Sequence, residues 1–203
     1  MVELLAKKTG LTEYLLLPYD GKRTEFVDGE ILDMAEASPL HVFITTFIQQ
    51  FLNVHIKAQQ RSLFCLGPTG VEIPRISEKN NVRSPDAVVC GRGQWQAMKH
   101  LTKAVFAEGN PPALAIEVAS PGNTERDTVD KRIEYALASV PEYWIINPVD
   151  GYVLVAVLKD GEYQDVGEYR NSELISSHLF PNLKVTAATL LDPDIDDLEQ
   201  ASL

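Results

Sequence analysis

The order of apolar and polar positions divides the first part of the chain into a hairpin and a long helix. Asp28-Gly29 separates two short apolar runs, 24–27 and 30–34, and this dipeptide between such runs is a strong signal for a β-hairpin. Apolar residues then recur every three or four positions over residues 40–56, which predicts a helix with a wide apolar face. Ser38-Pro39 supplies a suitable cap and first turn. We expect this helix to pack against a sheet.

The rest of the chain alternates short apolar runs with one further helical segment. We expect a helix from Thr124 to Val140, with Thr124 and Asp127 as a capping box that has aspartate in place of glutamate. Asp160-Gly161 predicts a second tight turn, whereas residues 91–112 predict a looser connection. Strands are predicted at residues 62–66, 71–74, 113–119, 143–147, 152–158 and 162–169, and the polar residues 77–81 predict a loop. A further strand is expected to begin near Asp86, because Pro85 lacks a ladder donor.

This order of elements predicts a mixed α/β sheet with flanking helices. The strand–helix–strand passage from Ile116 to Ile145 favours a right-handed parallel crossover, and the meander before it favours antiparallel neighbours. We expect the last hairpin to be appended after the core. The length predicts a single domain over residues 1–203, with a core at about 11–190 and a solvated acidic tail at about 191–203.

Composition narrows the class of protein. No apolar run approaches the roughly 20 residues of a membrane span, and the N-terminus lacks the apolar region of a secretory signal, so we expect a cytoplasmic protein with no membrane partner. Cys65 and Cys90 lie in apolar runs, which predicts buried free thiols. The net charge of −11 argues against a broad nucleic-acid-binding face, although basic residues at a single site matter more than the sum.

Two acids in apolar, strand-like runs are the main chemical signal. Asp86 follows Pro85, and Glu117 lies inside Ala115–Ala119. A charge in such a run is costly unless something pairs with it. Two acids on neighbouring strands can share a hard divalent cation, as in a metal-dependent phosphodiesterase. The alternatives are that Asp86 caps an amide in a turn and that Glu117 forms an ordinary salt bridge with a base such as Lys131.

The orientation of Lys131 is open at the level of sequence. Lys131 shares one helical stripe with Asp127 and Tyr135, because the three residues are four apart. The apolar stripe marked by Val129, Ile133, Ala136 and Val140 points nearly opposite. If only the apolar stripe meets the sheet, Lys131 faces water. If the polar stripe faces the cleft, Lys131 can reach the acids.

Three other features carry weaker signals. His41 lies in the first turn of the long helix, where a lone histidine is more often structural or exposed. Glu25 is an acid on a predicted strand and means little alone. Residues 120–123 lead into a helix N-terminus, which favours an anion such as phosphate. Ser120 lacks a nucleophile-elbow sequence, so we do not expect it to be an acyl nucleophile.

A family resemblance rests on an ordered set of segments from about residue 11 to the late hairpins. The matching segments are Arg23–Ile31, Ser38–His41, Val82–Asp86, Ile116–Pro121, Asp127, Lys131, Tyr135 and Val140–Pro148. In this order and spacing they resemble the Uma-type putative restriction endonuclease family, within the PD-(D/E)XK nuclease superfamily. The resemblance implies a restriction-endonuclease-like core with an N-terminal hairpin and a C-terminal β-hairpin.

The resemblance also implies a site. Asp86, Glu117 and the backbone carbonyl of Val118 would bind Mg²⁺ or Mn²⁺. The superfamily has a lysine two positions after the second acid, where this chain has Ala119. In the Uma-type family the lysine comes from the next helix, which matches Lys131.

The expected function is therefore that of a metal-dependent endonuclease, a hydrolase that cuts DNA phosphodiester bonds. Lys131 would orient the attacking water or offset charge on the phosphorane, and Glu25, which matches an acid of the family's hairpin, would be a supporting ligand or position water. Two alternatives are a catalytically inactive binding module and a metal-dependent hydrolase of a small phosphorylated molecule. The exposed edges and tyrosines of the last hairpin would suit a homodimer, by analogy with nucleases that cut two strands.

Overall fold

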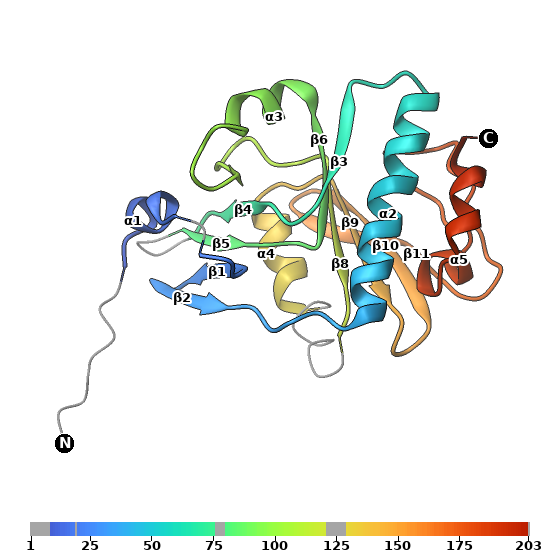
Figure 1. Cartoon of the computed structure of the whole chain (residues 1–203), viewed down its shortest axis with the longest axis horizontal. Helices are drawn as coiled ribbons and strands as arrows, with labels where there is room; N and C mark the ends of the chain where they lie inside the picture. The colour runs from blue at the N-terminus through green and yellow to red at the C-terminus, as the bar shows by residue number, and fades with distance from the viewer. Residues whose placement is uncertain (1–8, 19, 76–79, 121–128, 203) are drawn as a thin grey trace.

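Two mixed β-sheets and five α-helices make up the described part of the chain. The computed structural model describes residues 9–18, 20–75, 80–120 and 129–202. Figure 1 shows the smaller sheet beside α1 (Leu11–Leu16) near the N-terminus and the larger sheet beside the helix α2 (Pro39–Ala58). No helix within these ranges combines the length and the apolar character that a membrane crossing requires.

The larger sheet has six strands and contains the predicted crossover. β8 and β9 are parallel, and α4 (Lys131–Leu137) lies between them in the chain, as the sequence predicts. The last hairpin is not an appendage, because β10 pairs with β9 and its side chains enter the core. In spatial order the strands are β11 (Glu162–Tyr169), β10 (Tyr152–Lys159), β9 (Glu142–Asn147), β8 (Leu114–Val118), β6 (Ala87–Gly91) and β3 (Leu63–Leu66).

The smaller sheet has five strands and contains the predicted N-terminal hairpin. Asp28 and Gly29 have φ values of 55° and 85°, and two positive φ values are what a type I′ turn requires. The neighbours β4 and β7 are parallel and the other pairs are antiparallel. In spatial order the strands are β2 (Glu30–Asp33), β1 (Thr24–Val27), β5 (Asn81–Arg83), β4 (Gly70–Ile73) and β7 (Val105–Phe106).

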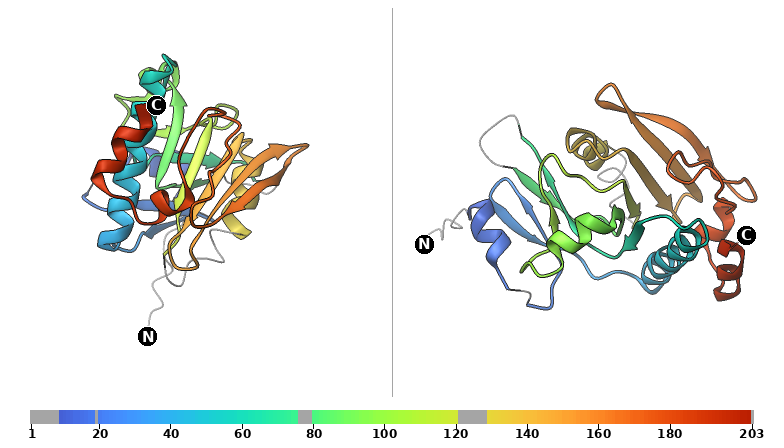
Figure 2. Two further views of the ribbon diagram at one scale, coloured as in Figure 1. Left: turned by 90° about the vertical axis from the view of Figure 1, so that its right-hand side faces the viewer. Right: turned by 90° about the horizontal axis from the view of Figure 1, so that it is seen from above.

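Helices cover both faces of the larger sheet. Figure 2 shows α2 and α4 on opposite sides of it, and two separate groups of buried apolar side chains fill these faces. The predicted cap of α2 is confirmed, since Ser38 Oγ accepts a hydrogen bond from the amide of His41 at 3.2 Å. The acidic C-terminal residues do not form a loose tail. Beyond α5 (Ala187–Leu191) they form a 3₁₀ helix, η2 (Ile195–Ser202), that contacts α2.

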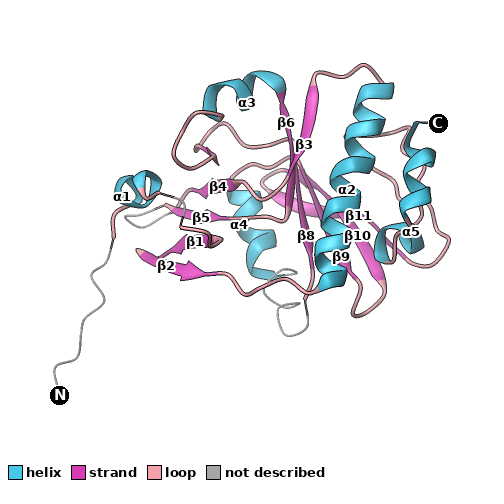
Figure 3. Ribbon diagram, in the orientation of Figure 1, coloured by secondary structure: helices cyan, strands magenta, loops and turns pink. Residues whose placement is uncertain are grey.

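Two stretches differ from the sequence-based expectation, as Figure 3 shows by element type. Asn81, which was expected to end a polar loop, instead begins β5. The strand expected to begin near Asp86 is β6, which belongs to the other sheet, and Asp86 lies just before it because Pro85 cannot continue a strand ladder. The connection at 91–112 contains the helix α3 (Arg92–Met98) and β7. Too few apolar residues mark α3 for its period to show. The predicted capping box of Thr124 and Asp127 lies outside the described residues.

Candidate active site

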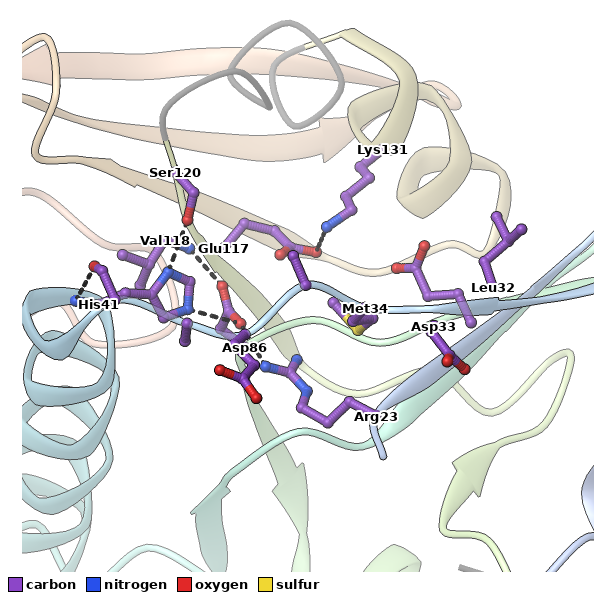
Figure 4. Close-up of a pocket in the computed structure, with 15 residues that line it drawn as sticks. Arg23, Leu32, Asp33, Met34, His41, Asp86, Glu117, Val118, Ser120 and Lys131 are labelled. Carbon is purple, nitrogen blue, oxygen red and sulfur yellow. Dashed lines mark hydrogen bonds and ion pairs between the residues drawn. The ribbon is translucent and has the colours of Figure 1, made fainter. Parts of the chain in front are cut away.

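A cavity of about 460 Å³ lies where the two sheets meet. Figure 4 shows its side chains, which come from β1, β2, the start of α2, β8 and α4. All the residues that the sequence singled out for the site line it, namely Glu25, Asp86, Glu117, Val118 and Lys131. The structure therefore brings together groups that are separated by as many as 106 positions in the chain (131 − 25 = 106).

The pairing of β6 with β8 places the two acids opposite each other. The register joins Ala87 to Ile116 and Val88 to Ala115, so one further step sets Asp86 against Glu117. Residues opposite each other on an antiparallel pair share a face, with Cβ atoms about 4.5–5.5 Å apart. Both side chains are almost fully buried. The two carboxylates thus belong to one small site.

Asp86 accepts hydrogen bonds from two donors and contacts a third group, His41. Its Oδ2 accepts a hydrogen bond from the amide of Val118 at 2.9 Å, and its Oδ1 lies 3.1 Å from Arg23 Nη1. His41 Nε2 is also 3.1 Å from Oδ1, in an ion-pair contact without hydrogen-bond alignment. Burial alone would raise the pKa of Asp86, but His41, the Val118 amide and Arg23 outweigh it and hold the pKa below the usual value.

Glu117 is held by the next helix. It is 2% exposed on an interior strand, and its Oε1 lies 2.9 Å from Lys131 Nζ. The hydroxyl of Tyr135 donates to the same oxygen at 2.7 Å. Burial, and then the charge of Glu117, keep the pKa of Tyr135 well above 10, so this hydroxyl remains a donor.

The orientation of α4 answers the question that the sequence left open. Lys131 is only 4% exposed and Tyr135 is fully buried, so the polar stripe faces the cavity. The predicted apolar stripe is divided: Val129 and Ile133 are about half exposed, as is Leu137, whereas Ala136 is partly buried and Val140, beyond the end of the helix, is fully buried. Figure 4 shows the Lys131 side chain extending toward Glu117. The amine that the strand lacks at Ala119 is thus supplied from the helix.

Glu25 belongs to a buried ion-pair network that the sequence analysis did not recognise. Arg83 Nη1 lies 2.9 Å from Glu25 Oε2, and Arg83 also binds both oxygens of Glu134 on α4, through Nε and Nη2 at 2.5 and 2.9 Å. Burial alone would lower the pKa of Arg83, but the two carboxylates outweigh it and raise it. The network fixes Glu25 at the cavity wall and ties α4 to the smaller sheet. The sign of this network in the sequence was Arg83, a basic residue three positions before Asp86.

His41 also lines the cavity, which its sequence position gave only weak reason to expect. The sequence analysis noted that a lone histidine there is more often structural or exposed, and its contacts are compatible with a structural role. Nδ1 is 3.2 Å from Ser120 Oγ while Nε2 faces Asp86. Its position in the first turn of a capped helix was the available signal, because that turn points at the ends of β6 and β8.

The donor set suits a hard divalent cation. Two opposed carboxylates and the backbone carbonyl of Val118 are oxygen ligands of the kind that Mg²⁺ and Mn²⁺ prefer. Among the described residues there is no cluster of three or more His, Cys, Asp or Glu side chains that could hold a metal ion. Any ion would therefore depend on these two acids, the backbone and water.

Comparison with known proteins gives two matches. Residues 11–188 match the model of the Uma2 family, whose description is putative restriction endonuclease. A crystal structure of a putative nuclease belonging to DUF820 from Anabaena variabilis is similar, with a TM-score of 0.69 and 18% identity over 96% of this chain and 99% of that chain. At that identity the likeness shows the fold alone, and it confirms the predicted restriction-endonuclease-like α/β fold. No curated protein matches the sequence.

Proposed function

The chain belongs to the Uma2 putative restriction endonuclease family, and from this premise we propose that it is a Mg²⁺- or Mn²⁺-dependent endonuclease that hydrolyses DNA phosphodiester bonds. Family and fold support a nuclease-like function. The metal, the DNA substrate and the roles of individual residues are the parts that we propose.

One observation carries the proposal. Lys131 Nζ lies 2.9 Å from Glu117 Oε1, and the strand register sets Glu117 opposite Asp86. Two acids and an amine in one cavity form the set of groups that metal-assisted phosphodiester hydrolysis needs. An isolated salt bridge inside a core would not line a cavity of about 460 Å³.

Each residue of the site has a role in this proposal. Asp86, Glu117 and the Val118 carbonyl would hold the metal ion, which would polarise the scissile phosphate and lower the pKa of the attacking water. Lys131 would orient that water or offset charge on the phosphorane. Glu25, fixed by Arg83, would position water at the cavity wall.

The test is nicking of supercoiled plasmid DNA by the purified protein with Mg²⁺ or Mn²⁺. We expect Asp86→Asn to lower the rate roughly a hundredfold or more, because it keeps the volume but removes the charge that would bind the ion. Asp160→Asn is the matched control, since Asp160 lies in an exposed turn with a φ of 53° that asparagine tolerates. Equal nicking by Asp86→Asn and the wild type would remove the proposed roles.

A second candidate is a binding module that keeps the fold without catalysis. The specific observation in its favour is that Arg23 and Lys131 already lie against Asp86 and Glu117, so both carboxylates have partners in the chain itself. Titration with Mn²⁺ separates the two candidates. No binding at millimolar Mn²⁺ by fully folded protein would favour the binding module.

A further inference from the structure

The proposed function assigns no catalytic or binding role to Arg23, although this residue lines the cavity. It directly precedes β1, and its backbone carbonyl accepts a hydrogen bond from the amide of Met34 at 2.9 Å. Its guanidinium reaches the connection between β5 and β6, with Nη1 on Asp86 Oδ1 at 3.1 Å and Nη2 on the carbonyl of Ser84 at 3.2 Å. Figure 4 shows the side chain pointing at Asp86 from the opposite wall of the cavity.

The guanidinium is incompletely satisfied where it lies. Its Nε is buried and has no hydrogen-bond partner among the described groups. Arg83 shows the contrast, because its Nε and Nη2 together bind the two oxygens of Glu134. A buried donor without an acceptor costs free energy, and a planar fork is best satisfied by two oxygens of one anion. Arg23 now contacts one carboxylate oxygen and one backbone carbonyl and leaves Nε over, so its fork is matched to an anion that offers two oxygens.

The charges of the cavity also conflict with metal binding as they stand. The chain sets one permanent cation on each proposed ligand, Arg23 on Asp86 and Lys131 on Glu117. A divalent ion between the two acids would lie beside both cations and repel them. Arg23 is the more readily displaced, since its side chain is 31% exposed and that of Lys131 is 5% exposed.

We propose that Arg23 exchanges partners: it is the counter-ion of Asp86 before the metal binds and a ligand of a DNA phosphate afterwards. This inference rests on the proposed function. Metal binding occupies Asp86 and releases the guanidinium, whose Nε and terminal nitrogens then take two oxygens of one phosphodiester. Before the metal binds, Arg23 offsets the charge of buried Asp86, while Lys131 does the same for Glu117.

The exchange predicts effects of opposite sign in one variant. Arg23→Gln removes a competitor of the metal and also a ligand of the phosphate. Mn²⁺ affinity, measured by isothermal titration calorimetry without DNA, should rise about tenfold. A cation within ~4–6 Å of a carboxylate weakens proton binding by about this factor or more, and we expect a similar effect on binding of a metal ion. The affinity for a fluorescent DNA duplex, measured with Ca²⁺ in place of Mn²⁺, should fall about tenfold. The slope of log affinity against log salt concentration should decrease by about one, because one phosphate contact is lost.

Two further variants make the test specific. Lys22→Gln is the matched control, since it removes the same charge from the neighbouring residue, whose ammonium lies on Asp33 and whose side chain is exposed. It should leave both affinities within about twofold of the wild type. Arg23→Lys keeps the charge but not the fork, so Mn²⁺ affinity should stay unchanged while duplex binding weakens. This variant also serves if Arg23→Gln does not fold, which thermal melting would show.

The outcomes separate this inference from the proposed function. If the wild type binds Mn²⁺ and Arg23→Gln binds it equally or less tightly, the exchange is wrong and the proposed nuclease function still stands. If Arg23→Gln weakens both metal and DNA binding, Arg23 is a structural residue and the inference fails. If the folded wild type binds no Mn²⁺, the proposed function fails and the exchange fails with it.

Discussion

Glu117 and Glu142 are buried acids on neighbouring strands, and their partners distinguish them. Glu117 has an amine and a phenol beside it and lines the cavity. Glu142 accepts hydrogen bonds from three neutral donors: Trp144 Nε1 at 2.6 Å, Ser177 Oγ at 2.7 Å and the amide of Leu179 at 2.7 Å. The side chain of Glu142 therefore holds the segment that follows β11 against strand β9. At the scale of single residues, burial of an acid does not identify a site, whereas its partners do.

Replacement of Glu142 tests this structural role. Glu142→Gln puts an amide group among donors, so one buried donor loses its acceptor, and we expect the free energy of unfolding to fall by about 1–3 kcal/mol. Urea denaturation measures the change. Glu162→Gln, an equivalent change on the exposed end of β11, should have almost no effect. Equal stability of both variants would show that the three hydrogen bonds to Glu142 contribute little.

Among the elements, α4 shows the least usual arrangement. A surface helix ordinarily buries its apolar side chains, yet α4 buries Lys131 and Tyr135 and leaves Ile133 and Leu137 about half exposed. The ion pair of Lys131 with Glu117 and the two bonds from Arg83 to Glu134 hold the helix in this rotation. Polar contacts that form the site thus take precedence over the helix's own hydrophobic pattern.

Two isoleucines test the rotation of α4. Ile133→Lys should change the free energy of unfolding by no more than about 0.5 kcal/mol, because Ile133 is 59% exposed. Ile145→Ala, on the fully buried β9, should cost about 2–5 kcal/mol. Chemical denaturation compares them directly. A comparably large loss in Ile133→Lys would mean that the apolar stripe of α4 is buried and that Lys131 faces solvent.

At the scale of the whole molecule, the site exists because two sheets meet. The chain passes from β5 to β6 through Ser84, Pro85 and Asp86, and this passage carries the first acid to the junction. The smaller sheet contributes Arg23 and Glu25, and the larger sheet contributes Glu117 with its helix. Neither sheet contains enough of these groups to form the site alone.

The two cysteines report on the integrity of the whole fold. Both thiols are free and buried, and burial raises the pKa of Cys90 to about 11 and that of Cys65 further. We expect neither to react with Ellman's reagent at pH 8 in the native protein, and both to react once it is denatured. Rapid modification of native protein would show that the core opens locally.

The same thiols give a pH dependence with a definite sign. The unfolded thiols ionise near pH 8.5, whereas the folded thiols stay neutral to higher pH. From about pH 8.5 upward the unfolded state therefore binds fewer protons, and the thiol contribution lowers stability by about 1.4 kcal/mol per pH unit for each thiol until its folded pKa is reached. Below about pH 8.5 this contribution is constant. Comparison of Cys90→Ala with the wild type in urea at pH 7 and pH 10 isolates it.

The sequence by itself determined the features that depend on neighbouring residues. Asp28-Gly29 fixed the first hairpin, because its two residues accept positive φ, and Ser38 fixed the start of α2 by capping it. The apolar run around Glu117 was identifiable as an interior strand that carries a charge, and Asp86 after Pro85 as its companion acid. Family resemblance then assigned roles to both acids and to Lys131. The fold class followed from the order of such elements.

Only the tertiary structure decided which distant groups meet. The division of residues 81–89 between two sheets, the rotation of α4 and the contacts of Arg23, His41 and Arg83 all depend on strand order and register. Periodicity states which positions share a face, but it does not state which face of another element lies opposite. In α4 the pattern left the orientation open, and the structure turns Lys131 inward, where it pairs with the buried carboxylate of Glu117.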